Sequence, residues 1–357
     1  MPGRITRRSA LTQAACWAVS PALLSPVAQS LLAADPAAES TLVDGPLPRP
    51  AKDSFTVAVL PDTQNYSERF PELFLAQTQW LVENREDRNI AAVLHLGDIT
   101  NRNLPEQWQN AQKAMNQLDG HLPYFMVPGN HDYSDNGSCQ DRTTLLNEYF
   151  PVAKFKETPN FAAVYDKESD RMENNCQLFS AGGRNFVVIG LEFGPRKDVV
   201  RWANEMAEKY KDREAILITH AFIYSDETRY DWAKYGTKQT WNPHSYPIAK
   251  NTGDDVMDGE ELWQNLVSKH ENFILTLNGH VLHDGLGRVV TATPGGREVP
   301  QCLVNFQMKP RGGDGWLRLL EFRPDGKTVQ VYDYSPTLNK RNTSSQNEFE
   351  LKLAPIV

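Results

Sequence analysis

The stretch NIAAVLHLGD, residues 89–98, decides the fold that we expect for this chain. It is a short apolar run that ends at a glycine and an aspartate. A run of this length without a polar face predicts a strand that is buried on both sides, as in a sheet covered by helices. The stretches SFTVAVLPD (54–62) and PYFMVPGNHD (123–132) have the same arrangement.

Segments with helical spacing of their apolar residues alternate with these strands. Residues 72–87 and 106–118 predict helices on either side of the strand at 89–98. Further strands and helices are expected in alternation at 184–194, 199–210, 213–222, 259–270 and 271–280. This alternation indicates an α/β sheet with covered faces. The last part differs, because residues 302–308, 315–323, 328–335 and 349–354 predict antiparallel strands.

Charge and composition exclude some classes of protein. The chain has 357 residues, 40% of them hydrophobic, and a formal net charge of −8. An acidic chain of this kind is not held to nucleic acid by its overall field, so we expect no nucleic-acid scaffold as partner. Its length suits one large domain or two modest ones.

The N-terminal residues 1–34 are typical of an export signal. Basic residues come first, a moderately apolar stretch follows, and small residues suited to cleavage end it. The run TRRSALT (6–12) resembles the twin-arginine signal, which implies transient contact with that export machinery and a periplasmic or secreted protein. Pro21 and Pro26 interrupt the apolar stretch, so we expect no permanent membrane span. The alternative is an ordinary basic and disordered start.

Residues 35–53 are rich in proline, alanine and charge and predict a flexible linker, so that one domain would occupy 54–357. Three cysteines lie beyond the signal. Cys139 and Cys176 both have polar flanks and are candidates for a disulfide, although sequence alone does not set connectivity. Cys302 lies in an apolar run and is expected to be a buried thiol.

Polar clusters follow the predicted strands, where an α/β sheet binds its ligands. The stretches LPDTQNY, LGDITNRN, VPGNHDY, ITHAF and LNGHVLHD each begin at a strand end. A set of carboxylates, amides and imidazoles at one edge of a sheet suits a pair of divalent cations. The candidate residues are Asp62, Gln64, Asp98, Asn130, His131, His220, His280 and, with less support, His283.

The order D-x-[H/Q], GD, GNH-[D/E], H and GH resembles the calcineurin-like metallophosphoesterase superfamily from about Ser54 to the C-terminus. The resemblance implies a four-layer α/β/β/α sandwich with mixed sheets. It also implies hydrolysis of phosphoric esters, with a two-metal site activating water for in-line attack on phosphorus. The alternative is that these residues are strand-end turns and core histidines.

The resemblance also implies a role for each matching residue. Asp98 would bridge two metal ions, and Asp62 and Gln64 would bind the first ion. Asn130, His220 and His280 would complete the second site. His131 would be the general acid or would stabilise the transition state, and Asp132 would orient its ring.

Two positions depart from the pattern. Gln64 stands where a histidine is more familiar, and Leu282 occupies the place of a second histidine after His280. His283 and Asp284 are candidates to complete the first site, or His283 is a solvated loop residue. A first site rich in oxygen donors favours manganese or magnesium over zinc or iron and binds weakly, so the identity of the two ions stays open.

The long segment 224–254 is rich in aromatic residues. Either it packs on its own side chains, or it forms a substrate wall together with Tyr66. In the second case Arg229 would pair with phosphate, and Trp232 or Trp241 would stack on an organic group. We expect His95 to be a packed core residue, and His121 and His270 to be solvated. The rival function is a protein of the same fold that binds a phosphate ligand or metal without catalysis.

Overall fold

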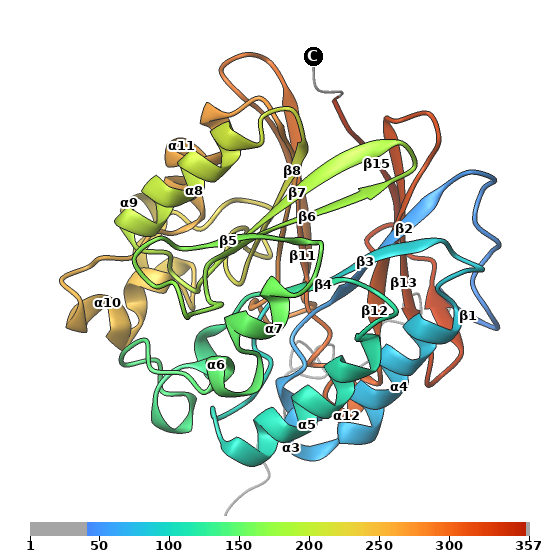
Figure 1. Cartoon of the computed structure of the whole chain (residues 1–357), viewed down its shortest axis with the longest axis horizontal. Coiled ribbons are helices and arrows are strands. Elements are labelled where there is room, and N and C mark those ends of the chain that lie inside the picture. Colours follow the sequence, from blue (N-terminus) through green and yellow to red (C-terminus); the bar gives the residue numbers. More distant parts are fainter. Residues whose placement is uncertain (1–40, 355–357) are drawn as a thin grey trace, which may run out of the picture. The chain divides into compact units, whose positions relative to one another are not determined.

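The computed structural model describes residues 41–354, whose elements are drawn in Figure 1. The strands are β1 (Leu42–Asp44), β2 (Phe55–Leu60), β3 (Ile90–His95), β4 (Tyr124–Met126), β5 (Phe161–Val164), β6 (Asn175–Ala181), β7 (Arg184–Leu191), β8 (Glu214–Thr219), β9 (Phe273–Asn278), β10 (Leu286–Ala292), β11 (Glu298–Val304), β12 (Leu317–Phe322), β13 (Thr328–Ser335), β14 (Lys340–Asn342) and β15 (Glu348–Lys352). The α-helices are α3 (Gln64–Arg69), α4 (Pro71–Glu83), α5 (Pro105–Met115), α6 (Leu146–Tyr149), α7 (Val152–Lys156), α8 (Lys197–Lys209), α9 (Trp232–Tyr235), α10 (Pro247–Asn251), α11 (Gly259–Asn265) and α12 (Pro310–Gly313).

These strands form two mixed sheets. One has the order β1-β14-β13-β12-β2-β3-β4, with β15 beside β13, and the other has the order β10-β11-β9-β8-β7-β6-β5. Strands β2, β3 and β4 run parallel in the first sheet. In the second sheet β7, β8, β9 and β11 run parallel. Each sheet therefore has a parallel centre whose strand ends can carry a site.

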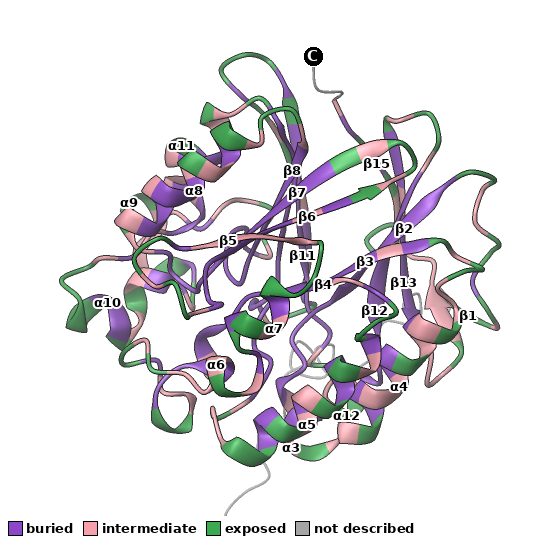
Figure 2. Ribbon diagram, viewed as in Figure 1, coloured by how far each residue is buried: buried purple, intermediate pink, exposed green. Residues whose placement is uncertain are grey.

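The two sheets pack face to face, and helices cover their outer faces. Val57 and Val59 of β2 share a buried cluster with Ile216 and Ile218 of β8. The alternate residues of β2 share another cluster with the side chains of α4 and α5, and β7 packs likewise against α8. Figure 2 shows the central strands buried and these helices exposed on their outer side. The predicted four-layer α/β/β/α sandwich with mixed sheets is thus confirmed.

Two interpretations of the sequence differ from the structure, those of the cysteine pair and of the linker. Cys176 lies inside β6, and Cys139, Cys176 and Cys302 are all free and buried, so the candidate disulfide between Cys139 and Cys176 is not formed. Cys302 is the core thiol that we expected. Residues 41–53, the described part of the predicted linker, are attached to the domain, because β1 pairs with β14 and Arg88 donates hydrogen bonds to backbone carbonyls of this segment.

The predicted export signal at 1–34 lies outside the described residues. Within residues 41–354, no helix combines the length and the apolar character that crossing a bilayer requires.

Candidate metal centre

The predicted residues follow strands of both sheets. Asp62 follows β2, Asp98 follows β3, and His220 comes directly after β8. One ligand atom from each of these three residues lies within 4.8 Å of the other two. A cavity of about 100 Å³ adjoins this group, and its walls include most of the other predicted residues. It is lined by Gln64, Asp98, Asn130, His131, Trp241, Tyr246, His280, Leu282 and Gln307.

The glycines of the motifs let these strand ends approach one another. A Cβ atom on Gly129 would collide with the Asp98 carboxylate, and one on Gly279 would collide with the Asp62 carboxylate. Asp98 and His280 themselves have positive φ values of 47° and 75°. Residues other than glycine rarely adopt this conformation, and it is concentrated at functional sites. The backbone here is therefore shaped to bring polar side chains together.

Asp98 lies at the centre of the cluster. Its Oδ1 accepts a 3.0 Å hydrogen bond from the His131 backbone N–H, and His220 Nε2 lies 3.2 Å from the same oxygen. Burial alone would raise the pKa of Asp98, but the facing His220 and His131 hold it well below its usual range. Asp98 is thus a buried carboxylate that stays ionised.

Three buried polar atoms in the cluster make no hydrogen bond. They are Gln64 Oε1, Asn130 Oδ1 and His220 Nε2, and all three belong to predicted metal ligands. An unpaired buried polar atom costs free energy, so its presence needs an explanation. His220 Nδ1 donates to the Leu96 carbonyl oxygen at 2.8 Å, so Nε2 faces Asp98 and can bind an ion once it has given up its proton. These are the donor types and orientation that a divalent cation requires.

The electrostatics of the cluster favour added positive charge. Burial would lower the pKa of His220, but the carboxylates of Asp98 and Asp62 raise it to about 9. Burial raises the pKa of Asp62 to about 7, and the nearby Asp98 contributes to this increase. Two carboxylates held together in a buried site are stabilised by a neighbouring positive charge, which protonated His220 supplies here and which a bound cation would supply in its place. The residues present therefore fit a metal ion.

His280 reaches the cluster from the loop after β9. Its ring centroid lies 4.8 Å from that of His220, and its Nε2 donates to the Trp241 carbonyl oxygen at 2.8 Å. Nδ1 is then the nitrogen that is free to bind an ion. Trp241 has a φ of 64°, which is unusual for a bulky residue and aims its carbonyl at the His280 ring.

His131 and Asp132 are arranged differently from our expectation. The Nδ1 of His131 donates to the Asn101 carbonyl oxygen at 2.9 Å. Asp132 is fully buried and accepts hydrogen bonds from the backbone N–H groups of Gly129, Ile99 and Thr100. Asp132 therefore ties the two motif loops together and does not orient the His131 ring. The resemblance implied that Asp132 would hold the ring, and the Asn101 carbonyl holds it instead.

Neither candidate for the missing histidine completes the site. His283 and Asp284 are exposed, and His283 Nε2 lies 3.3 Å from the Tyr224 hydroxyl. Two residues that sequence reasoning missed contact Asp62 instead. Asn305 Nδ2 and Gln307 Nε2 donate to Asp62 Oδ2 at 2.9 and 3.1 Å. The strand-end rule would have found Asn305, had we recognised that β11 pairs in parallel with β9.

The aromatic segment 224–254 is mainly packed on its own residues and on neighbouring helices. Arg229 is paired with Glu260 and lies over the Trp263 ring, so the expected phosphate contact is wrong. Trp232 stacks on His244, away from the cavity. Tyr66 is buried, with its hydroxyl accepting from Gly315 N–H, and is not part of a wall. Of the expected wall, Trp241 lines the cavity, together with Tyr246.

The other histidines have structural surroundings. His95 is buried as expected, with Nε2 2.9 Å from the Thr63 hydroxyl. His121 is exposed, whereas His270 is half-buried against Asn204. His244 lies with Asp258 and Glu261 in a second group close enough to share an ion. Hydrogen bonds within that group and the capping of α11 by Asp258 account for its geometry.

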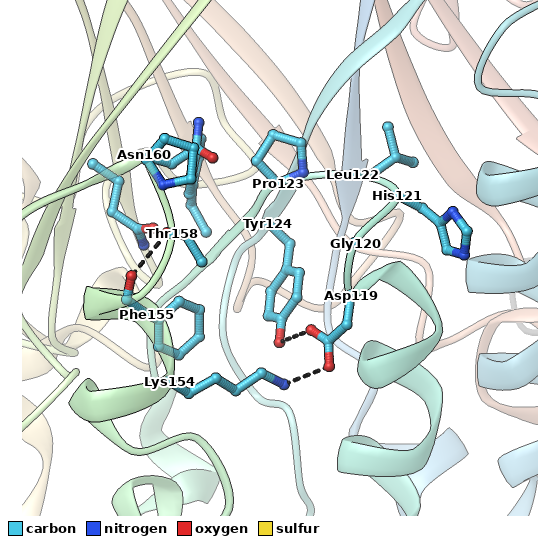
Figure 3. Close-up of a pocket in the computed structure, with 13 residues that line it drawn as sticks. Asp119, Gly120, His121, Leu122, Pro123, Tyr124, Lys154, Phe155, Thr158 and Asn160 are labelled. Carbon is cyan, nitrogen blue, oxygen red and sulfur yellow. Dashed lines mark hydrogen bonds and ion pairs between the residues drawn. The ribbon is translucent and has the colours of Figure 1, made fainter.

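A larger cavity, of about 300 Å³, lies near the beginning of β4, where parallel strands do not place ligand sites. Figure 3 shows hydrogen bonds and an ion pair within its lining. Tyr124 donates to Asp119, Lys154 pairs with the same carboxylate, and Thr158 donates to the Phe155 carbonyl. Size therefore does not identify the site in this protein; the gathering of unpaired atoms of Gln64, Asn130 and His220 around one buried carboxylate does.

Comparison with known proteins gives a consistent assignment. The family model described as calcineurin-like phosphoesterase matches residues 55–284. A curated relative, the uncharacterized protein YvnB of Bacillus subtilis (strain 168), is 29% identical over 340 residues. The match covers 91% of this chain and 24% of the relative, so the chain spans about a quarter of that protein's length.

Solved structures with a similar arrangement are distant in sequence. Purple acid phosphatase PPD1 of yellow lupin (Lupinus luteus) is 13% identical, with a TM-score of 0.46 over 85% of this chain and 55% of that one. GAP50 of Plasmodium is 12% identical, with a TM-score of 0.47 over 85% and 90% of the two chains. The 5'-nucleotidase precursor of Thermus thermophilus is 12% identical, with a TM-score of 0.40 over 84% and 54%.

Proposed function

The chain belongs to the calcineurin-like phosphoesterase family, and we propose that it is a metal-dependent hydrolase of phosphoric esters that uses a two-metal site. The observation that carries the proposal is the set of unpaired buried atoms on Gln64, Asn130 and His220. They surround the buried carboxylate of Asp98, at the place where the family motifs meet.

Two overlapping ligand sets account for these residues. Asp62, Gln64 and Asp98 would hold one ion, and Asp98, Asn130, His220 and His280 would hold the other. Divalent ions in such a pair supply Lewis-acid activation of water and offset charge on the phosphoryl oxygens. The first set contains only oxygen donors, which suit manganese or magnesium, whereas the second includes two imidazoles.

His131 is placed to act on the substrate. It lines the cavity, and its backbone N–H is bound to Asp98, so its position is tied to that of the bridging carboxylate. Because Nδ1 donates to the Asn101 carbonyl, Nε2 is the nitrogen left for the substrate, and in the protonated ring it can give a proton to the leaving oxygen or a hydrogen bond to a phosphoryl oxygen. Proton transfer to a leaving oxygen serves only turnover, and in this role His131 favours an enzyme, whereas a hydrogen bond to a phosphoryl oxygen would serve ligand capture as well.

The test is an assay of chelator-treated protein with phosphate monoesters, diesters and pyrophosphates, each with added manganese, magnesium, zinc or iron. We expect hydrolysis of at least one ester class, dependent on the added metal, and no hydrolysis by an Asp98→Ala variant. Tight binding of metal or phosphate without turnover of any ester would support the non-catalytic alternative and contradict the proposal.

A further inference from the structure

The loop that follows β11 closes one side of the proposed metal centre. β11 lies beside β9 in parallel, with Leu303 opposite Asn278. The residues after the two strands therefore emerge at the same edge of the sheet, and Asn305 is brought next to the loop that carries His280. This loop lies beyond residues 55–284, the part of the chain that matches the family model.

Asn305 is fixed in one orientation. Its side chain is 3% exposed, its Oδ1 accepts from the Gln307 backbone N–H at 2.9 Å, and its Nδ2 donates to Asp62 Oδ2 at 2.9 Å. The first bond assigns the oxygen and nitrogen of the carboxamide, since only the oxygen can accept. Asn305 therefore presents an N–H group, not an oxygen, to Asp62.

Gln307 donates to the same oxygen. Its Nε2 lies 3.1 Å from Asp62 Oδ2, and its side chain lines the cavity with Gln64 and Asp98. The His280 backbone N–H adds bonds of 3.1 and 3.2 Å to Oδ1 and Oδ2. Oδ2 is thus occupied by two carboxamides and shares a backbone donor, which leaves Oδ1 as the oxygen with fewer partners.

The loop itself is held firmly. The Asn305 backbone N–H donates to the Gly285 carbonyl at 2.7 Å. Further on, Arg311, Gly312 and Gly313 all have positive φ values. A Cβ atom on Gly312 would collide with Asn65, and one on Gly313 would collide with Tyr66, so glycine is required for this turn to pack on α3. The position of this loop beside Asp62 is therefore fixed by its packing on α3 and by its hydrogen bond to Gly285.

We propose that Asn305 and Gln307 are positioning residues that fix the Asp62 carboxylate so that Oδ1 is directed to the first metal ion. Donors to a ligating carboxylate hold its orientation and typically change metal affinity by about 10–100-fold. The inference rests on the proposed function in one respect, because it requires a divalent ion at Asp62.

The experiment is a titration of manganese into chelator-treated protein. Calorimetry measures the heat of binding, and electron paramagnetic resonance measures the concentration of free manganese. Asn305→Leu and Gln307→Met keep the size of each side chain and remove its N–H donors. We expect manganese affinity at one site to fall about 10-fold or more in each variant, with the melting temperature of the metal-free protein close to that of wild type. Gln330→Met, which changes a carboxamide that bonds only backbone carbonyls of β13 and β15, is the matched control and should bind as wild type does.

The outcomes separate this inference from the function on which it rests. If wild type binds none of manganese, magnesium, zinc and iron, the proposed function fails. If wild type binds manganese and Gln307→Met binds it with equal affinity, the positioning role is overturned while the function stands. Gln307 is half-buried, so this variant keeps the test decisive even if Asn305→Leu does not fold.

Discussion

At the scale of single residues, the site depends on a few atoms whose hydrogen bonds are missing or unusually placed. Asn130 and His220 keep unpaired atoms beside Asp98, although both residues are buried. His131, in contrast, is held by the Asn101 carbonyl and the Asp98 carboxylate. The first two residues have the surroundings of ligands, and the third has those of a group that acts on the substrate.

His131→Ala should lower turnover by about 100-fold or more, because general acid catalysis contributes on that scale. Metal content should not change, since the His131 side chain is not among the proposed ligands, and loss of its hydrogen bond to the Asn101 carbonyl should lower the melting temperature only slightly. Steady-state kinetics together with metal analysis measures both effects. His121→Ala, at an exposed position, is the control. A His131→Ala protein with wild-type turnover would remove this residue from the mechanism.

Gln64→His should tighten the first metal site and move its preference toward zinc or iron, because imidazole suits those ions better than an amide oxygen does. Wild type should have low activity as purified and gain activity when manganese is added in excess. Metal titration with phosphate release as the signal compares the two proteins, and Gln79→His on the surface of α4 controls for an added histidine. Two tightly held ions in wild type, unchanged in the variant, would show that another donor completes the site.

At the scale of elements, the sequence predicts buried strands better than it predicts their partners. Strands β2, β3 and β8 are recognisable because nearly every residue is apolar, and they place Asp62, Asp98 and His220 correctly. β6 was missed because it contains buried polar residues such as Asn175, whose amide is satisfied by the Met126 carbonyl. The residues of β11 do not indicate that this strand runs parallel to β9. For that reason Asn305, which follows β11, was not predicted to lie at the site.

The segment around η5 (Pro243–Ser245) should have a pH-dependent stability. Burial lowers the pKa of His244, but Glu261 and Asp254 raise it to about 9 overall. A folded-state pKa above the unfolded value means that protonated His244 stabilises the fold below pH 6.5, and this contribution is lost as pH rises toward 9. Melting temperatures of wild type and His244→Gln should therefore differ most at the acidic end of this range and converge above it.

His270→Gln is the control for this pH effect. Burial lowers the pKa of His270, so its neutral form persists over the same range and the variant should show no convergence. A difference between wild type and His244→Gln that stays constant with pH would contradict the assigned ion pairs.

At the scale of the whole molecule, the N-terminal region is interpreted from its sequence alone, and we propose export by the twin-arginine route to the periplasm or beyond. Replacing Arg7 and Arg8 by lysine should leave the precursor in the cytoplasm, as judged by fractionation and immunoblotting. Arg4→Lys, which lies outside the TRRSALT run, should be exported normally. Export of the double variant would show that the signal is of another kind.

The fold and the convergence of the site could be predicted because the motifs lie at strand ends, a position that parallel sheets bring together. The contacts that orient the loops and rings of the site could not be predicted. Asp132 binds three backbone N–H groups, and Trp241 reaches His280 with its carbonyl, so neither role depends on a pattern of side chains. Such contacts are set by loop geometry across long separations in sequence.

The most direct test of the account is a crystal structure of the protein soaked in manganese, with anomalous scattering recorded. We predict two peaks about 3.5–4 Å apart, bridged by Asp98, one beside Asp62 and Gln64 and the other beside Asn130, His220 and His280. In His280→Ala the second peak should disappear or weaken strongly. Anomalous density that avoids Asp98, or two unchanged peaks in the variant, would contradict the metal centre on which the proposed function is built.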